Sequence, residues 1–219
     1  MILFQLFREE KEQRGKLFDY LLNEFPQIKT LLFAINSKPN DSIYDQDVQT
    51  YFGEGFLMEE MDGLKFKIGP KSFFQTNYKQ ALELYRKTLE FADLKGDEVV
   101  YDLYTGTGTI AQYVARNAKQ VIGIESVQEA IDAAKEHAEL NGLSNCTFYC
   151  GDMKDIFNDE ILASHPKADV LITDPPRDGM HQKVVEQILK LSPEKIVYVS
   201  CNSATQARDL ALMKDQYKL

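Results

Sequence analysis

The spacing of apolar residues changes near residues 75–80, and this change predicts two parts of different architecture. Beyond that point, short apolar runs alternate regularly with segments of helical spacing, which is typical of βαβ units and a mainly parallel sheet. The predicted strands are Val99 to Tyr104, Gln120 to Glu125, Cys146 to Tyr149, Val170 to Thr173 and Lys195 to Val199. The predicted helices are Thr109 to Ala118, Val127 to Leu140, Lys154 to Leu162, Gln182 to Leu191 and Ala204 to Met213.

The first part has shorter and less regular elements. Apolar residues from Phe4 to Phe25 fit a helix that ends at Pro26. Asn77 is suited to cap a further helix, over Tyr78 to Phe91. The strand-like pieces between these two helices are Thr30 to Ile35, Tyr51 to Phe52, Phe56 to Glu59 and Leu64 to Ile68, with a turn at Asp62-Gly63.

These patterns predict an α/β fold class. We expect a small α+β domain over residues 1–77, followed by a doubly wound, mainly parallel, Rossmann-like sheet over residues 78–219. In such a sheet the ligand crevice lies at the carboxyl ends of the strands. Every candidate chemical motif of the chain falls at one of those ends.

The composition is that of an ordinary globular protein. Of the 219 residues, 44% are hydrophobic and 27% are charged, and no stretch approaches the roughly 18 apolar residues of a transmembrane helix. The start of the chain lacks a signal-peptide pattern, so we expect a cytoplasmic protein. The net charge of −9 argues against a broadly basic nucleic-acid-binding surface and leaves room for a local basic groove. The three cysteines predict neither a disulfide framework nor a metal site, and we expect His137, His165 and His181 at the surface.

Cys201 lies just after the last predicted strand and just before the last predicted helix. A thiol at that place faces the crevice, and the backbone N–H groups of a helix start favour its thiolate form. Free cysteines are more often small buried hydrophobes than nucleophiles, so the position alone is a weak indication.

A glycine turn follows the first strand of the sheet. Gly106 and Gly108 allow the backbone to approach a ligand closely, and a helix begins at Thr109. The dinucleotide-binding fingerprint needs a third glycine where this chain has Ala111, which is a tolerated variant. A nicotinamide cofactor therefore stays an alternative at this point.

Acidic residues follow the next two strands. Glu125 suits the two hydroxyls of an adenosine ribose, and Asp152 could accept a hydrogen bond from an adenine amine. The structural alternative is that both acids only cap or flank the helices that follow them. Asp174 comes after the fourth strand, where Pro175 and Pro176 fix an extended turn and Arg177 offers a fork suited to phosphate.

The chain resembles the RNA uracil-5-methyltransferases, which use S-adenosylmethionine. The resemblance runs from about Asn40 to the end of the chain. The segments that carry it are Phe73-Phe74-Gln75-Thr76-Asn77, Asp102 to Ile110, Asp174-Pro175-Pro176-Arg177 and Ser200-Cys201-Asn202. It implies a class I methyltransferase fold and an RNA partner, with ribosomal RNA favoured over transfer RNA and 5-methyluridine as the product.

The resemblance also implies residue roles. Cys201 matches the nucleophile, and Arg177 is expected to contact the RNA substrate. The residues expected to bind S-adenosylmethionine are Gln75, Tyr104, Gly106, Gly108, Thr109, Glu125, Asp152 and Asp174. Addition of the cysteine thiolate at uracil C6 makes C5 nucleophilic toward the methyl group, and a base then removes the C5 proton so that the cysteine can leave.

The chain departs from the family pattern in four places. Ser203 stands where proline is common, and Thr105 stands where many members have cysteine. Family members continue into two further strands with a glutamate general base between them. They also usually carry an N-terminal RNA-binding barrel, sometimes with cysteines for an iron–sulfur cluster. The resemblance thus implies a fragment that binds S-adenosylmethionine but turns over slowly or not at all.

An incomplete sheet has a further consequence. The strand Lys195 to Val199 would keep an exposed apolar edge, so we expect self-association through it. Two other function classes stay open from the residues alone: an NAD-dependent oxidoreductase, and an RNA-binding module without catalytic activity.

Overall fold

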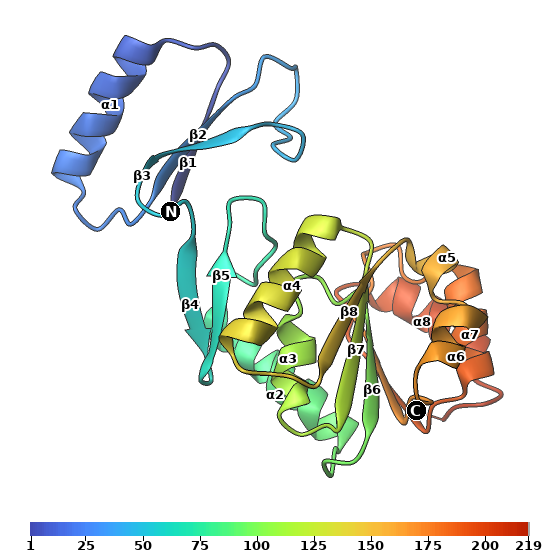
Figure 1. The fold of residues 1–219 in the computed structure, drawn as a ribbon. Coiled ribbons are helices and arrows are strands. Elements are labelled where there is room, and N and C mark those ends of the chain that lie inside the picture. The colour runs from blue at the N-terminus through green and yellow to red at the C-terminus, as the bar shows by residue number, and fades with distance from the viewer. Residues whose placement is uncertain (219) are drawn as a thin grey trace. The chain divides into compact units, whose positions relative to one another are not determined.

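The computed structural model describes residues 1–218. The chain forms two compact units (Figure 1). The first comprises Met1–Glu60 and Phe66–Phe74, and the second comprises Met61–Lys65 and the chain from Gln75 onward. The predicted domain boundary after Asn77 stays a prediction.

The first unit packs one helix on a three-stranded sheet. Its elements are β1 (Ile2–Leu6), α1 (Lys11–Glu24), β2 (Leu31–Ile35) and β3 (Val48–Phe52). The strand order is β1-β2-β3, with β1 parallel and β3 antiparallel to β2. Phe18 of α1 is fully buried, with its ring centroid 5.1 Å from that of Phe4 and 6.0 Å from that of Phe33.

The predicted helix over Phe4 to Phe25 is wrong at its start. Residues Ile2–Leu6 form β1, and the helix begins only at Lys11. Phe4 pairs with Phe33 of β2, which lies far along the chain. The backbone hydrogen bonds and aromatic packing supplied by β2 therefore decide the conformation of this segment, since strand preference depends on such neighbours.

A two-stranded sheet, β4 (Leu57–Met61) with β5 (Leu64–Ile68), precedes the long helix α2 (Tyr78–Ala92). Its turn is the predicted Asp62-Gly63, and both residues have positive φ, as tight hairpin turns require. The tip of this hairpin belongs to the second unit. There Lys65 exchanges two hydrogen bonds with Asn141, at 2.8 and 2.9 Å, and Arg116 Nη1 donates to the Asp62 carbonyl at 2.8 Å.

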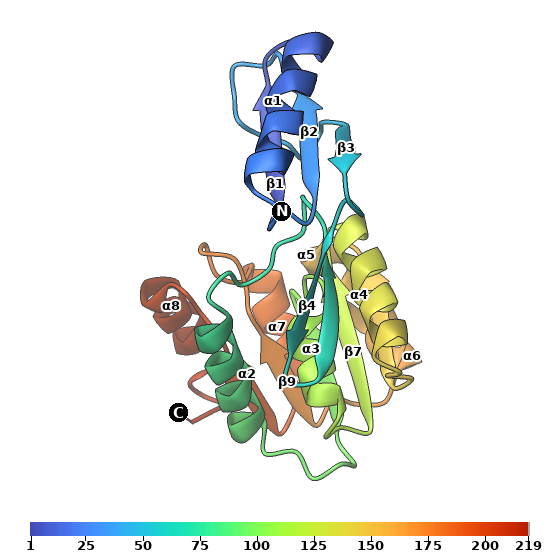
Figure 2. The ribbon, with the colours of Figure 1, turned by 90° about the vertical axis from the view of Figure 1, so that its left-hand side faces the viewer.

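The second unit is a five-stranded parallel sheet with helices on both faces (Figures 1 and 2). The strand order is β10-β9-β6-β7-β8. The strands are β6 (Val99–Leu103), β7 (Gln120–Glu125), β8 (Cys146–Cys150), β9 (Val170–Thr173) and β10 (Lys195–Tyr198). The helices after α2 are α3 (Thr109–Ala115), α4 (Gln128–Leu140), α5 (Met153–Ile156), α6 (Asp159–Ser164), α7 (Gln182–Leu191) and α8 (Ser203–Met213).

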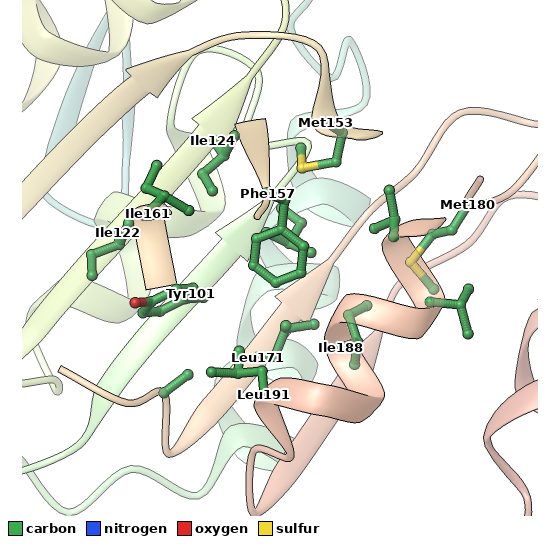
Figure 3. Packing of buried hydrophobic residues seen from close by; sticks show 14 of the residues in the cluster. Tyr101, Ile122, Ile124, Met153, Phe157, Ile161, Leu171, Met180, Ile188 and Leu191 are labelled. Atoms are coloured by element: carbon green, nitrogen blue, oxygen red, sulfur yellow. The ribbon is translucent and has the colours of Figure 1, made fainter. Parts of the chain in front are cut away.

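Strand β6 lies at the centre of this sheet and is buried along its whole length. On one face, its side chains pack with those of β7, β9, α5, α6 and α7 in one apolar cluster (Figure 3). Tyr101, Ile122, Leu171 and Ile188 are all fully buried there. Burying each such side chain contributes roughly 1.5–3 kcal/mol, so this cluster holds the strand ends in fixed positions.

Two further expectations need correction. The helix predicted over Lys154 to Leu162 is two short helices, because Asn158 interrupts it and its side chain accepts hydrogen bonds from Glu160 N and Ile161 N to start α6. His137 was expected at the surface, yet it is only 2% exposed and its Nδ1 lies 3.1 Å from the Thr107 carbonyl oxygen. Among residues 1–218, no helix is long and apolar enough to cross a membrane.

Candidate functional site

The strand order places a crevice beside β6. The chain runs from β6 through β7 to β8 on one side, and then crosses back to β9 and β10 on the other side. The carboxyl ends of β6 and β9 lie next to each other, as the pairing of Leu103 with Thr173 shows. Ligands bind at such a reversal of strand order. The predicted residues Tyr104 and Asp174 directly follow these two strand ends.

The glycine turn after β6 is held tightly. Tyr104 adopts a left-handed backbone conformation, with φ of 62°, which turns the chain away from the strand. Gly108, with φ of 76°, precedes α3, and a side chain there would have its Cβ 3.0 Å from that of Ala134. Thr109 begins α3, and its Oγ1 accepts a hydrogen bond from Tyr85 of α2 at 3.0 Å. The turn therefore brings the backbone of Gly106 and Gly108 to the crevice.

Glu125 ends β7 and joins two turns. Its Oε1 accepts hydrogen bonds from Ser126 N at 2.7 Å and from Val127 N at 3.1 Å. Its Oε2 accepts one from Gly106 N at 3.2 Å. The carboxylate thus supports the start of α4, as the structural alternative expects, and it lies beside the glycine turn, as the nucleoside interpretation expects.

Asp152 also has a local role. It caps α5, accepting a hydrogen bond from Lys154 N at 3.2 Å, and it forms an ion pair with Lys154 Nζ at 2.9 Å. The hydrogen bond from the Lys154 side chain lowers the pKa of Asp152. A small pocket of about 130 Å³ brings Asp152 together with Tyr104 at the crevice. Its lining residues are Tyr104, Ser126, Asp152, Met153, Lys154 and His181.

Two acids, buried Asp102 and half-buried Asp174, lie at or next to the adjacent carboxyl ends of β6 and β9. Asp102 of β6 is 1% exposed, and its Oδ2 accepts a hydrogen bond from Thr105 Oγ1 at 2.6 Å. Its Oδ1 has no hydrogen-bond partner within residues 1–218. Burial raises the pKa of Asp102 to about 7, and the nearby negative charge of Asp174 adds to this rise. Burial also raises the pKa of Asp174 to about 6.

The sequence motifs did not single out Asp102 as a site residue. The signal that could have found it is an acid inside an otherwise apolar strand, which is costly to bury without a partner. Along β6 the side chains alternate between the two faces of the sheet, so Asp102 faces away from the cluster that contains Tyr101. Its unpartnered carboxylate oxygen lies one residue before the carboxyl end of β6 and is an acceptor suited to a cationic group.

Cys201 and Arg177 lie on neighbouring segments. Cys201 is exposed and stands two residues before the start of α8. The backbone carbonyl of Arg177 accepts hydrogen bonds from Asn202 Nδ2 and from Thr205 Oγ1, both at 3.0 Å. The structure therefore joins the Asp174 to Arg177 segment to the segment that carries the candidate nucleophile.

Gln75 is the predicted site residue with the fewest contacts to the other candidate residues. It is half-buried at the start of the second unit, two residues before Asn77, whose side chain caps α2. Within residues 1–218 its side chain makes no hydrogen bond to the other candidate residues. In the same part of the chain, no group of three His, Cys, Asp or Glu side chains is arranged to hold a metal ion.

Comparison with known proteins gives the family. Residues 94–219 match the sequence profile of the methyltransferase domain family. The chain belongs to this family. It is 56% identical over 213 residues to an uncharacterized RNA methyltransferase of Porphyromonas gingivalis, covering 97% of this chain and 46% of that protein. It is 38% identical over 216 residues to one of Clostridium tetani, covering 98% of this chain and 47% of that protein.

Two of the solved structures that match this chain come from Pyrococcus abyssi. The tRNA (uracil-54, C5)-methyltransferase of Pyrococcus abyssi, in complex with S-adenosyl-L-homocysteine, matches with a TM-score of 0.74 and 32% identity, over 87% of this chain and 46% of that one. Trm5b of the same organism matches with a TM-score of 0.61 and 15% identity, which shows the fold alone. The chain spans about half the length of the curated relatives it matches.

These findings confirm the predicted class I, Rossmann-like methyltransferase fold and the resemblance to RNA methyltransferases. The nicotinamide alternative loses its support, because the matched family is one of methyltransferases. The assignments of individual site residues stay predictions.

Proposed function

We propose that this chain is the central and cofactor-binding part of an RNA uracil-5-methyltransferase that uses S-adenosylmethionine. The observation that carries the proposal is the position of Cys201, which is exposed directly beyond β10 and tied through Asn202 to the loop after β9. Support comes from the 32% identity to a tRNA uracil-5-methyltransferase.

The residues present fit S-adenosylmethionine. That cofactor supplies an electrophilic methyl group on a cationic sulfonium and carries an ammonium group as well. Asp102 offers a buried carboxylate, one oxygen of which lacks a partner within residues 1–218, and Asp174 offers a half-buried one. The glycine turn supplies close backbone approach, and Glu125 and Asp152 supply acceptors for the nucleoside. Tyr104, Thr109 and Gln75 complete the proposed set.

Cys201 would act on the uracil ring. Its thiolate would add to C6, opening the C5–C6 double bond and moving an electron pair to C5. S-adenosylmethionine would supply the methyl group for C5, and its sulfur would keep the electron pair of the broken methyl–sulfur bond and leave as the thioether. A base next takes the C5 proton, the double bond reforms, and the C6–sulfur bond breaks to release Cys201. The target base must leave its stack to reach this position.

The RNA is expected to approach the exposed face of Cys201 and Arg177. Ribosomal RNA is the favoured target, ahead of transfer RNA, and the protein is expected in the cytoplasm. Within residues 1–218 β10 is an outer strand of its sheet, and self-association through that edge is also proposed.

Mass spectrometry of a covalent adduct tests the proposal. The chain is incubated with S-adenosylmethionine and RNA that contains 5-fluorouridine, whose fluorine cannot leave as a proton does. We expect an adduct with the mass of chain, RNA and one methyl group. Cys201→Ala should abolish it, and the matched control Cys150→Ala should retain it. Absence of the adduct in the unaltered chain, or its persistence in Cys201→Ala, would refute the proposal.

A further inference from the structure

We propose that Asp209 and Arg208 are positioning residues, which hold the Arg177 segment and the Cys201 segment in one fixed arrangement. This inference rests on the proposed function. Both residues lie in the interior of α8, outside the sequence motifs.

Asp209 joins three segments. It is fully buried. Its Oδ2 accepts hydrogen bonds from Met180 N, in the loop after β9, at 2.7 Å and from the Tyr198 hydroxyl of β10 at 2.8 Å. Cys201 follows Tyr198 by three residues, and Met180 follows Arg177 by three residues. One carboxylate oxygen therefore ties together the two chain segments that approach the uracil in the proposed reaction.

Arg208 extends the same network. Its Nε and Nη2 both donate to Asp209 Oδ1, at 2.9 and 2.7 Å, so two guanidinium nitrogens share one carboxylate oxygen. Nη2 also donates to the carbonyl oxygens of Asp178 at 2.8 Å and Met180 at 3.3 Å. The guanidinium thus holds the buried carboxylate and the backbone of the loop after β9 at the same time.

A second attachment lies at the start of α8. Asn202 Nδ2 and Thr205 Oγ1 both donate to the carbonyl oxygen of Arg177. Asn202 is the neighbour of Cys201, and its side-chain oxygen also caps α8 by accepting from Ala204 N at 3.1 Å. The loop from Arg177 to Met180 is therefore bonded to α8 at both of its ends.

Gly179 shows how closely the loop approaches the helix. It has a φ of 76°, and a Cβ built on it would lie 2.5 Å from Arg208 Nη2 and 2.7 Å from Asp209 Oδ2. No side chain fits in that space without displacing the network. The approach of the backbone to the Arg208–Asp209 pair therefore requires glycine at this position.

The contribution of a buried ion pair to stability does not by itself explain why Arg208 and Asp209 occupy these positions. Moving a carboxylate out of water costs several kcal/mol, and well-packed apolar residues are often as stabilising as a buried ion pair. What the pair supplies is direction, because each hydrogen bond fixes one backbone or hydroxyl group. A displacement of about 1 Å at a reacting group can cost on the order of 100-fold in rate. We therefore expect the network to act on the covalent step, and not on cofactor binding at Glu125 and Asp152.

The test uses three variants that loosen the network in different ways. Asp209→Asn removes the charge, Tyr198→Phe removes one hydroxyl donor, and Gly179→Ala displaces the loop. Ile122→Val, in the fully buried part of β7, is the matched control for a general loss of stability. The first readout is the rate of adduct formation with 5-fluorouridine RNA at saturating S-adenosylmethionine and RNA. The second is the affinity for S-adenosylhomocysteine, measured by calorimetry.

We expect adduct formation to slow by roughly 10-fold or more in Asp209→Asn and Gly179→Ala, and less in Tyr198→Phe. The affinity for S-adenosylhomocysteine should stay within about twofold of that of the unaltered chain, and Ile122→Val should change neither. Equal losses in rate and affinity, or a loss in Ile122→Val as large as that in Asp209→Asn, would overturn the inference.

Amide hydrogen exchange tests the network without the reaction. In Asp209→Asn, exchange should quicken together at residues 178–180 and 201–203, while the turn at residues 104–108 keeps its protection. Unchanged exchange in both loops would refute the positioning role. If the unaltered chain forms no adduct, the proposed function fails, whereas hydrogen exchange still decides whether Asp209 joins the two segments.

Discussion

Replacing Asp102 with asparagine removes the only charge from the middle of the central strand β6. Asparagine keeps a carbonyl oxygen that can accept the hydrogen bond from Thr105, and it has almost the same shape. The change therefore isolates the ionisation of this buried group. Its effect on stability should depend strongly on pH.

The direction of the change in stability with pH follows from the difference between the pKa of Asp102 in the folded chain and in the unfolded chain. Burial raises the pKa of Asp102 from its ordinary 3.8 to about 7, so the unfolded chain loses this proton at a lower pH than the folded chain does. Between these values unfolding releases a proton, and the free energy of unfolding falls as pH rises, by about 1.4 kcal/mol per pH unit. Below pH 3.8 the side chain is neutral in both states, and the stability is fully present.

Above pH 7 Asp102 is ionised in both the folded and the unfolded chain, so the free energy of unfolding has fallen by its full amount. A shift of about three pKa units corresponds to roughly 4 kcal/mol, a large share of the 5–15 kcal/mol that is usual for a folded domain. Asparagine cannot ionise, so the variant should escape this loss. An unpaired amide N–H group in its place costs about 1–3 kcal/mol at every pH, which shifts the whole curve without changing its slope.

Urea unfolding of both proteins at pH 4.5, 5.5, 6.5 and 7.5, without cofactor, measures the effect. We expect the stability of Asp102→Asn relative to the unaltered chain to increase by about 2–4 kcal/mol across this range, with equal m-values. Thr105→Val, which removes the hydroxyl donor that lowers the pKa of Asp102, should extend the fall in stability to higher pH. Parallel curves for the unaltered chain and Asp102→Asn would refute the reasoning, because Asp102 would then be ionised throughout.

Three further predictions concern Glu125, Gly123 and the cap of α6. Glu125→Gln should weaken S-adenosylhomocysteine binding about 10-fold in calorimetry, since a neutral amide is a poorer acceptor for ribose hydroxyls; an unchanged affinity would leave Glu125 only the role of supporting the turn. Gly123→Ala should lower stability by about 1–3 kcal/mol in urea unfolding, because the new Cβ would lie 2.6 Å from Phe148 Cδ1; a neutral effect would mean that the ring moves freely. Asn158→Ala should cost about 1 kcal/mol through loss of the cap of α6, and a thermal midpoint equal to that of the unaltered chain would contradict this.

The parallel sheet could be predicted from sequence because each of its strands is a recognisable run of apolar residues. Strands β7 and β9 have the predicted bounds, since runs of buried β-branched and aliphatic residues between helical segments indicate little else. The segment Ile2–Leu6 has no such signal. Its strand conformation depends on β2, more than twenty residues further along the chain, so local spacing suggested a helix.

In the candidate site, too, residues at strand ends could be predicted from sequence, whereas residues that depend on distant partners could not. Glu125 and Asp174 could be placed because strand ends of a parallel sheet meet at one edge. Asp209 could not, because its partners Met180 and Tyr198 come from other segments and only the folded chain brings them to α8. The surface position predicted for His137 is wrong for a similar reason, since the spacing of α4 does not show its contact with the Thr107 carbonyl.

The hairpin tip Met61–Lys65 sets a limit on how the chain can be divided. It hydrogen-bonds to Asn141, Arg116 and Tyr113, although Asn77, the predicted boundary, lies beyond it. A piece cut at that boundary would lose part of its own fold, and the partners of the tip would be left facing water. The smallest autonomous methyltransferase piece of this chain should therefore begin before β4, and not at the helix where the sequence pattern changes.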